Sequence, residues 1–361
     1  MDCAWKPNWE ETKQHFIDWW NHEGPILGTW STVPNGEPRA HVPDPGAPSD
    51  LIERYTNAAW RVASNHWRLA RARFPADVLP IADCSLGPGS LALALGSQPT
   101  FAEGTVWFNS FMEQDERPED RPRLRFDPQS RWWKLTEDML RRSAALARGK
   151  YIVGCPDLIE NMDIVASLRG SQRLLMDLVE RPEWVSRKVE EINQAWFAAY
   201  SRIYEIIKLE DGSSAWGAFS IWGPGKTAKV QCDASAMFSP AMFERFVMPA
   251  LTAQCDWLDH SMFHLDGHQC ICHLDLLLSI ESLDAIEWTT DPQVPSGGNP
   301  RWYPMYRKIL EAGKSVQAIG VRHDEIVPLL DAVGPKGLYI MTDFRDERDA
   351  EEVLRMVEPY R

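Results

Sequence analysis

The 361-residue sequence predicts an α/β fold, a single (β/α)8 TIM barrel with an N-terminal helical extension, in one domain that spans residues 1–361. Short apolar runs rich in β-branched and aromatic residues recur along the chain, and most are followed by a longer stretch with helical spacing of apolar residues. The short runs are apolar throughout rather than at every second position, which is typical of parallel strands covered by helices. The length also suits a barrel, since barrels of this class often exceed the usual domain size.

About eight strands are expected in this barrel, and in chain order they are residues 25–33, 77–84, 150–157, 214–223, 260–267, 283–290, 314–320 and 337–343. Helical spacing of apolar residues is clearest over 50–74, 171–207 and 239–259. Ser239 is expected to cap the last of these helices, with Pro240 at its first position.

An open doubly wound sheet is the alternative arrangement of the same elements. Its dinucleotide-binding form requires a G-x-G-x-x-G turn after the first strand, and no such turn follows residues 25–33. We therefore favour the barrel.

Composition and charge exclude several classes of partner. The net charge is −14 and the isoelectric point is near 5.2, whereas nucleic acids and anionic membranes require a basic surface. No apolar run approaches the roughly 20 residues of a membrane span, and the first residues lack the apolar core of a signal peptide. Seven cysteines, an odd number, indicate reduced thiols rather than a disulfide framework. These features predict a cytoplasmic protein.

The carboxyl ends of the strands are where a barrel of this kind places its chemistry. The residues expected there are mostly acidic or aromatic, and they are Asp83, Asp157, Trp222, His264, Asp266, Glu287, Trp288 and Asp343. A single Asp at such a position often caps the following helix. Several carboxylates that converge on one mouth would instead raise each other's pKa or recruit a cation.

Seventeen tryptophans are unusual for this length. Packing in the core and at its rim explains most of them, but some are expected to line a pocket for a flat or methylated ligand through stacking or cation–π contact. Trp107, Trp222 and Trp288 are the candidates for this pocket.

The run HLDGHQCICHLD, residues 264–275, contains three histidines and two cysteines. If residues 268–282 form an α-helix, Cys270 falls on its buried face, while Cys272 and His273 point away from that face in different directions. Only His268 and Cys272 could then share an ion on the helix. His264 and Asp266 differ, because they lie at the strand end and point into the barrel mouth.

Three longer segments carry a family resemblance, and they are residues 83–108, DCSLGPGSLALALGSQPTFAEGTVWF, residues 156–185, PDLIENMDIVASLRGSQRLLMDLVERPEWV, and residues 231–267, QCDASAMFSPAMFERFVMPALTAQCDWLDHSMFHLDG. With the closing segments LDAIEW and DAEEVLRMV, the chain resembles the uroporphyrinogen decarboxylase superfamily of barrels over most of its length. It is most similar to the cobalamin-linked methyltransferases and the uroporphyrinogen decarboxylase-like proteins of that superfamily.

The resemblance implies a metal site. In these methyltransferases a His-x-Cys pair at one strand end and a Cys at a later strand end hold a zinc ion, which activates the accepting thiol. In this chain His264 matches the His, Asp266 stands where the first Cys would be, and the last strand end offers Asp343. Zinc accepts carboxylate oxygens as well as imidazole. The resemblance therefore implies zinc or another divalent metal ion bound by these three residues.

The decarboxylase itself carries an arginine-rich N-terminal signature that binds the propionates of its tetrapyrrole. The corresponding stretch GPILGTWSTVPNGEPRAHV contains only Arg39. An acidic mouth without several arginines is electrostatically unfavourable for a polycarboxylate. Decarboxylation of uroporphyrinogen is therefore disfavoured.

The favoured hypothesis is a corrinoid-linked methyltransferase that moves a methyl group between a small substrate and a corrinoid carried by a partner protein. Asp233 or Glu287 would orient the substrate or move a proton, and Cys232 and Asp83 are predicted to contact it. Residues 225–235, GKTAKVQCDAS, are expected to form a loop after the fourth strand, and Cys232 and Asp233 in this loop could instead supply another metal ligand. One alternative is a carboxy-lyase in which a carboxylic acid donates a proton, and another is a binding barrel without catalytic activity. Members of the superfamily often pair, so a homodimer is also expected.

Overall fold

The computed structural model describes residues 3–30, 33–34 and 37–361, and it shows the predicted (β/α)8 barrel. Six parallel strands lie side by side in the order β1-β14-β13-β12-β11-β10, with bounds β1 (Ile26–Gly28), β10 (Thr227–Gln231), β11 (His260–Asp266), β12 (Ala285–Thr289), β13 (Ser315–Ala318) and β14 (Leu338–Met341). A second sheet has the order β4-β7-β8-β9, with bounds β4 (Ile81–Ala82), β7 (Ile152–Cys155), β8 (Ser214–Trp216) and β9 (Ile221–Gly223).

Hydrogen bonds join the two sheets at both of their edges. Asp77 N donates to Leu27 O at 3.0 Å, which holds the chain ahead of β4 beside β1. On the other side, Ser214 Oγ of β8 donates to Gly225 O at 2.7 Å, just before β10. The barrel wall thus continues from one sheet into the other.

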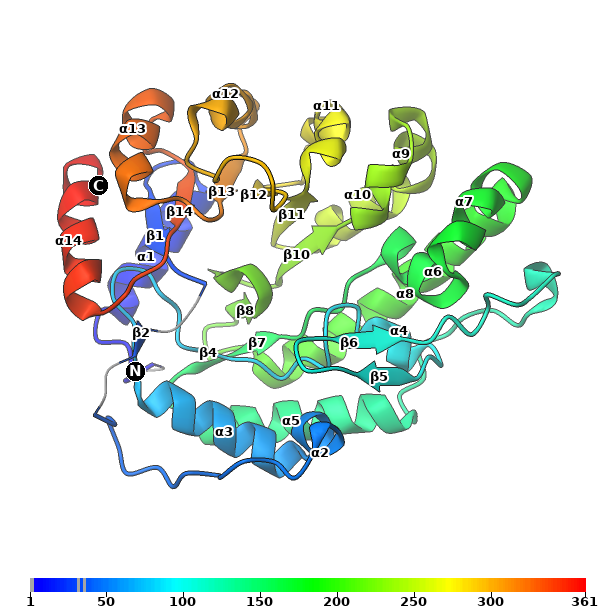
Figure 1. Cartoon of the computed structure of the whole chain (residues 1–361), viewed down its shortest axis with the longest axis horizontal. Coiled ribbons are helices and arrows are strands. Elements are labelled where there is room, and N and C mark those ends of the chain that lie inside the picture. The colour runs from blue at the N-terminus through cyan, green and yellow to red at the C-terminus, as the bar shows by residue number, and fades with distance from the viewer. Residues whose placement is uncertain (1–2, 31–32, 35–36) are drawn as a thin grey trace.

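Helices cover the outside of the barrel, with α3 and α5 along the β4–β7 sheet and α9 to α13 along the six-stranded sheet (Figure 1). Their bounds are α1 (Trp9–Trp20), α2 (Leu51–Thr56), α3 (Ala58–Ala70), α4 (Leu91–Ala94), α5 (Arg131–Ala147), α6 (Asn161–Arg169), α7 (Ser171–Glu180), α8 (Pro182–Ile207), α9 (Pro240–Phe246), α10 (Met248–Trp257), α11 (Leu274–Leu278), α12 (Tyr303–Glu311), α13 (His323–Val333) and α14 (Glu347–Val357). Two short antiparallel pairs, β2 (Val33–Pro34) with β3 (Ala72–Arg73) and β5 (Pro99–Phe101) with β6 (Val106–Phe108), lie outside the barrel wall.

The three long helical predictions are each divided into two helices. Pro182 begins α8, because proline lacks the N–H that would continue α7 and suits a first helical position. The Asn57 side chain accepts a hydrogen bond from Trp60 N at 3.0 Å and so starts α3 separately from α2. Ser239 caps α9 as predicted, since its Oγ accepts from Met242 N at 3.4 Å, but α10 then starts afresh at Met248.

The prediction of a single strand over residues 214–223 is wrong. The chain forms β8, turns through the 3-10 helix η2 (Ala218–Ser220), and returns as β9 antiparallel to β8. Phe219 and Ser220 have φ angles of 63° and 50°, so the reversal depends on two non-glycine residues in the left-handed region. The following segment, predicted as a loop, is strand β10.

This reversal carries Trp222 to the amino-terminal end of the barrel, where α1 covers the strands. Trp222 is 2% exposed, and its ring lies edge-on to Trp9 at 5.8 Å and to Phe16 at 6.3 Å. Trp20 Nε1 donates to Trp222 O at 3.0 Å, and Trp19 Nε1 donates to Val316 O at 3.2 Å. The prediction that Trp222 lines a pocket at the mouth is therefore wrong, and the residue packs the closed end instead.

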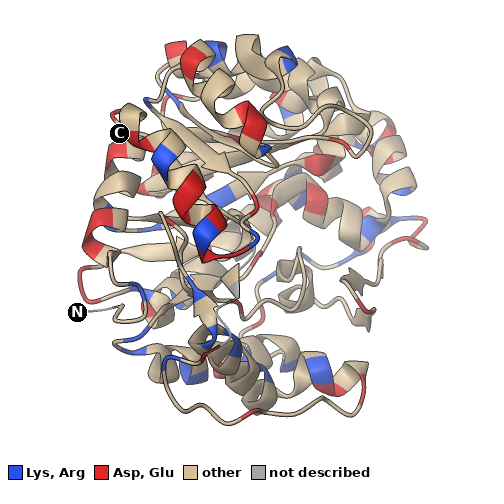
Figure 2. Ribbon diagram, turned by 60° about the vertical axis from the view of Figure 1, so that its left-hand side comes forward, with Lys and Arg blue, Asp and Glu red and all other residues tan. Residues whose placement is uncertain are grey.

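Lys and Arg positions and Asp and Glu positions are both scattered over the outer helices in the view of Figure 2. Among the described residues, no helix combines the length and the apolar character needed to cross a membrane.

Because Trp222 packs the closed end of the barrel, its substitution should lower the stability of the fold and leave the residues at the mouth in place. We expect Trp222→Ala to lower the free energy of unfolding by about 3–5 kcal/mol, because it leaves a large cavity beneath the strands. The midpoint of urea unfolding measures this effect. Trp107→Ala is the matched control, since Trp107 is 65% exposed and its loss should change stability by less than about 0.5 kcal/mol. A Trp222→Ala protein with unchanged stability would contradict this packing.

Candidate metal centre

The register of the sheet places four polar side chains in one row across the barrel interior. Gln231 pairs with His264, His264 with Glu287, and Glu287 with Gln317 on the successive strands β10 to β13. All four are buried. Side chains two positions apart on a strand share a face, so Asp266 lies above His264 on the side of the mouth. Asp233 stands two residues after Gln231, where the 3-10 helix η3 (Asp233–Met237) begins.

Asp233, His264 and Asp266 form a group that could hold a metal ion. Each offers a ligand atom, and these atoms all lie within 4.8 Å of one another. His264 Nε2 is 3.9 Å from Asp233 Oδ1. The His264 side chain is 9% exposed and that of Asp233 is 44% exposed. The group is therefore closed by protein below and open to solvent above.

Glu287 fixes the orientation of the His264 ring from below. His264 Nδ1 donates a hydrogen bond to Glu287 Oε2, and Thr289 Oγ1 donates to Glu287 Oε1 at 2.6 Å. With its proton on Nδ1, the ring presents the lone pair of Nε2 to the two aspartates. Burial by itself would lower the pKa of His264, but the adjacent Glu287 carboxylate outweighs it and raises that pKa. A carboxylate behind the ring is the usual support for a metal-binding histidine.

Asp163 and Gln231 hold Asp233 in place. Gln231 Nε2 donates to Asp233 Oδ2 at 2.8 Å and to Asp163 Oδ2 at 3.0 Å. The Asp163 carboxylate also accepts from the backbone N–H groups of Asp233 and Ala234, at 2.9 and 2.8 Å. Loss of surrounding water, and then the negative charge of Asp163, raise the pKa of Asp233 to about 7. A bound cation would relieve this repulsion.

A buried lysine fixes the orientation of the Gln231 amide. Lys229 is 0% exposed, forms an ion pair with Asp157 Oδ1 at 2.7 Å, and donates to Gln231 Oε1. Because the amide oxygen is thus occupied, the NH2 group of Gln231 must face the two aspartates. Lys229, Gln231 and Asp163 are not among the site residues predicted from the sequence. The alternation of Lys229, Gln231 and Asp233 at every second position is the signal that indicates one face of a strand.

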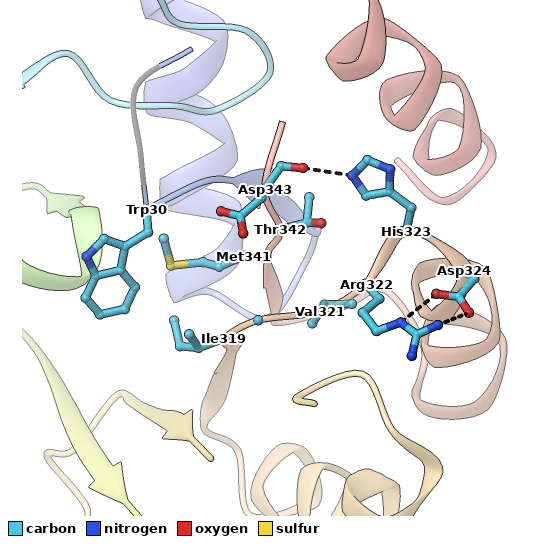
Figure 3. Close-up of a pocket in the computed structure, with 10 residues that line it drawn as sticks. Trp30, Ile319, Val321, Arg322, His323, Asp324, Met341, Thr342 and Asp343 are labelled. Carbon is cyan, nitrogen blue, oxygen red and sulfur yellow. Dashed lines mark hydrogen bonds and ion pairs between the residues drawn. The ribbon is translucent and has the colours of Figure 1, made fainter. Parts of the chain in front are cut away.

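Asp343, predicted as the third metal ligand, lies elsewhere. It follows β14, which is separated from β11 by β12 and β13, and it is exposed on the wall of a cavity of about 530 Å³ (Figure 3). Asp233, two residues after the end of β10, the strand next to β11, lies where Asp343 was expected. The structure thus groups His264 and Asp266 as predicted but replaces the third residue of the set.

The other predicted site residues lie outside the open mouth. Glu287 is 0% exposed and accepts a hydrogen bond from His264, so its carboxylate orients that ring and does not face the open mouth. Trp288 alternates with Glu287 on β12 and packs outward against Trp302, with ring centroids 4.8 Å apart. Trp107 is exposed on the β5–β6 hairpin. The predictions that Trp288 and Trp107 line the pocket do not fit these positions.

Asp83 and Cys232 have local roles. Asp83 Oδ1 accepts from Ser85 N at 2.9 Å and closes the turn after β4, as a capping residue would. Cys232 is buried between Gln231 and Asp233, and burial raises the pKa of its thiol well above the ordinary value. Neither side chain belongs to the group of three ligands.

In the run HLDGHQCICHLD, His264 and Asp266 belong to the metal group and the later residues do not, as predicted. The position of His273 is the exception. Cys270 is buried, and burial raises the pKa of its thiol to about 11, so it stays protonated at neutral pH. His268 binds Asp291 at 2.7 Å through Nδ1 and does not pair with the exposed Cys272. His273 was expected to point away from the core, but it is buried and stacks on Phe243 at 4.4 Å. Residues His268–His273 form a 3-10 helix, η4, whose tighter winding rotates His273 inward.

The support by Glu287 predicts a measurable change in metal affinity. We expect Glu287→Gln to weaken Zn²⁺ binding by about 10- to 100-fold, as loss of such a support usually does. Wild-type affinity should also fall at low pH, because a protonated ring cannot bind metal. In the variant this fall should occur at a lower pH, since the charge that raises the His264 pKa is gone. Calorimetric titrations from about pH 5 to about pH 8 measure both effects, and an unchanged pH profile would count against the assigned role.

Neither a family model nor a curated protein matches this sequence. Solved structures do match the fold. A methyltransferase from Methanosarcina mazei superposes with a TM-score of 0.59 at 10% identity, over 97% of this chain and 98% of that one. A B12-independent methionine synthase from Shewanella sp. W3-18-1, solved in complex with selenomethionine, gives 0.49 at 10% identity, over 92% and 97% of the two chains. This chain therefore shares the fold of the Methanosarcina methyltransferase over nearly its whole length.

Proposed function

We propose that this protein is a methyltransferase that binds a divalent metal ion, zinc by preference, at the barrel mouth through Asp233, His264 and Asp266. The methyl group would move between a small substrate and a corrinoid carried by a partner protein. The observation that carries the proposal is the convergence of three ligand atoms within 4.8 Å of one another, with the imidazole already oriented by Glu287. The shared fold of a methyltransferase supports it.

The donor set suits a catalytic metal. One imidazole nitrogen and two carboxylate oxygens are three protein ligands, and the exposed side of Asp233 leaves a position open to solvent. Three protein ligands with one open position are typical of catalytic zinc, whereas structural sites are closed. When bound, such an ion supplies a Lewis acid that lowers the pKa of a ligated substrate group.

The chain's own residues orient this site and shield it. Glu287 and Thr289 hold the proton of His264 on Nδ1. Phe219 packs against the imidazole with ring centroids 4.5 Å apart, and it would limit the approach of water from that side. Asp163, through Asp233 N and Ala234 N, fixes the loop that carries the Asp233 ligand.

Metal content tests the site directly. We expect protein purified without chelator to hold about one divalent ion per chain, and His264→Ala to lose it, because the three-ligand set is then incomplete. Asp343→Asn is the matched control, a carboxylate at another strand end, and it should keep the metal. Mass-spectrometric metal analysis gives the ratio. A metal-free wild-type protein that is folded would overturn the metal proposal.

Reaction class is tested with free methylcobalamin and a panel of small thiols. The methyl group would move from cobalt to the thiolate sulfur, the two electrons of the Co–C bond would stay on cobalt, and the thiol proton would be released. We expect the absorbance spectrum to show cob(I)alamin with wild-type protein and only the background rate with His264→Ala. Equal rates for the two proteins would argue against methyl transfer at this site.

One observation favours a carboxy-lyase as the second candidate. The pKa of Asp233 near 7 keeps part of this carboxyl protonated at neutral pH, as a proton donor requires. This function would need no metal. Release of CO2 from carboxylic acids by metal-free protein, abolished in Asp233→Asn, would favour the lyase over the methyltransferase.

A further inference from the structure

A cavity lies at the carboxyl ends of β1, β13 and β14, apart from the metal group. The cavity holds about 530 Å³, and among its walls are Trp30 after β1, Ile319 after β13, and Met341 and Asp343 at the end of β14 (Figure 3). None of these residues belongs to the metal group. The cavity therefore offers a binding site distinct from the three ligands.

Two apolar side chains of the cavity wall are held in place, Trp30 as an accessible indole and Met341 as a buried thioether. Trp30 is 52% exposed, so a ligand in the cavity could contact its indole. Its ring lies edge-on to Phe219 at 4.8 Å, so its orientation is fixed from behind. Met341 Sδ accepts a hydrogen bond from Gln317 Nε2 at 3.0 Å, which holds the thioether at the cavity wall.

The remaining charge in the cavity is negative. Arg322 lines it but forms a two-pronged ion pair with Asp324, at 3.0 and 2.7 Å, which neutralises its guanidinium. His323 Nε2 donates to the backbone oxygen of Asp343 at 2.8 Å. Among the residues that the structure describes, the Asp343 carboxylate itself has no hydrogen bond or ion pair. Figure 3 shows it on the same side as the Met341 sulfur and the Trp30 indole.

These walls select one class of ligand. An anion would be repelled by the Asp343 carboxylate, and a neutral apolar molecule would gain no electrostatic attraction from it. A small inorganic cation would need several oxygen ligands, and the cavity has a single unpaired carboxylate beside apolar walls. An organic cation satisfies both features, because its charge pairs with the carboxylate and its methyl groups contact the indole face.

We propose that this cavity binds an organic ammonium ion that carries methyl groups, held between Trp30 and Asp343. Phe219 connects the cavity to the metal group, since its ring contacts Trp30 at 4.8 Å and His264 at 4.5 Å. The bound ion would thus lie one aromatic ring away from His264. The identification of this ion as the small substrate of methyl transfer rests on the proposed function. The binding of the ion in the cavity does not.

Calorimetry with choline and with its neutral isostere 3,3-dimethylbutan-1-ol tests the ligand class. The two probes have the same shape and differ in charge, so in about 150 mM KCl choline should bind at least about 10-fold more tightly. Equal affinity for the two probes, or no choline binding, overturns the proposal. Loss of choline binding when Na⁺ replaces K⁺ would also overturn it, because it would indicate a site for inorganic cations.

Variants locate the site. Asp343→Asn and Trp30→Ala should each weaken choline binding by about 3- to 30-fold, and Trp30→Phe should retain part of it. Trp107→Ala, which removes another exposed indole, should bind choline as wild type does. Thermal unfolding checks that each variant is folded. Wild-type choline affinity in both Asp343→Asn and Trp30→Ala would contradict the proposal. Zinc content should be unchanged in Asp343→Asn, so failure of this site is distinguishable from failure of the metal site.

Discussion

The hydrogen bond that His264 Nδ1 donates to Glu287 determines which atoms face the barrel mouth. Glu287 is fully enclosed and already accepts from Thr289, so its carboxylate has no freedom to turn toward another donor. A buried polar group left unpaired costs about 1–3 kcal/mol, which opposes any rotation of the ring away from this partner. His264 therefore keeps the lone pair of Nε2 directed at Asp233 and Asp266, and the metal proposal depends on that direction.

A second consequence concerns where negative charge resides in the barrel. In the deeper layer, Lys229 pairs with Asp157, and burial raises the pKa of Glu160 to about 8, so that this carboxyl is mostly neutral at pH 7. The charges of these two deeper carboxyl groups are thereby compensated or removed. Asp233 and Asp266 lie above them at the mouth, where their negative charges favour the recruitment of a cation.

Sequence patterns predicted the barrel, the strands that carry His264 and Glu287, and two of the three grouped residues. They did not predict the reversal at Phe219 and Ser220, because neither residue type favours a left-handed backbone. Without that turn, β10 is not recognised as a strand. Its lysine and glutamine are typical of a loop, and they are buried here because Lys229 pairs with Asp157. Because neighbours in a barrel follow from strand order, the sequence patterns place Asp233 in a loop and not beside His264. The family resemblance implies Asp343 as the third ligand, but its strand, β14, lies too far around the wall.

X-ray absorption at the zinc edge of the metal-loaded protein examines the ligand set atom by atom. Asp233, His264 and Asp266 predict a first shell of nitrogen and oxygen only, at about 2.0–2.2 Å, with the outer-shell scattering of one imidazole. Cys232 and Cys270 are the nearby thiols that the structure leaves protonated. A sulfur scatterer at about 2.3 Å would show that one of them binds the metal, and it would contradict the assignment of this site.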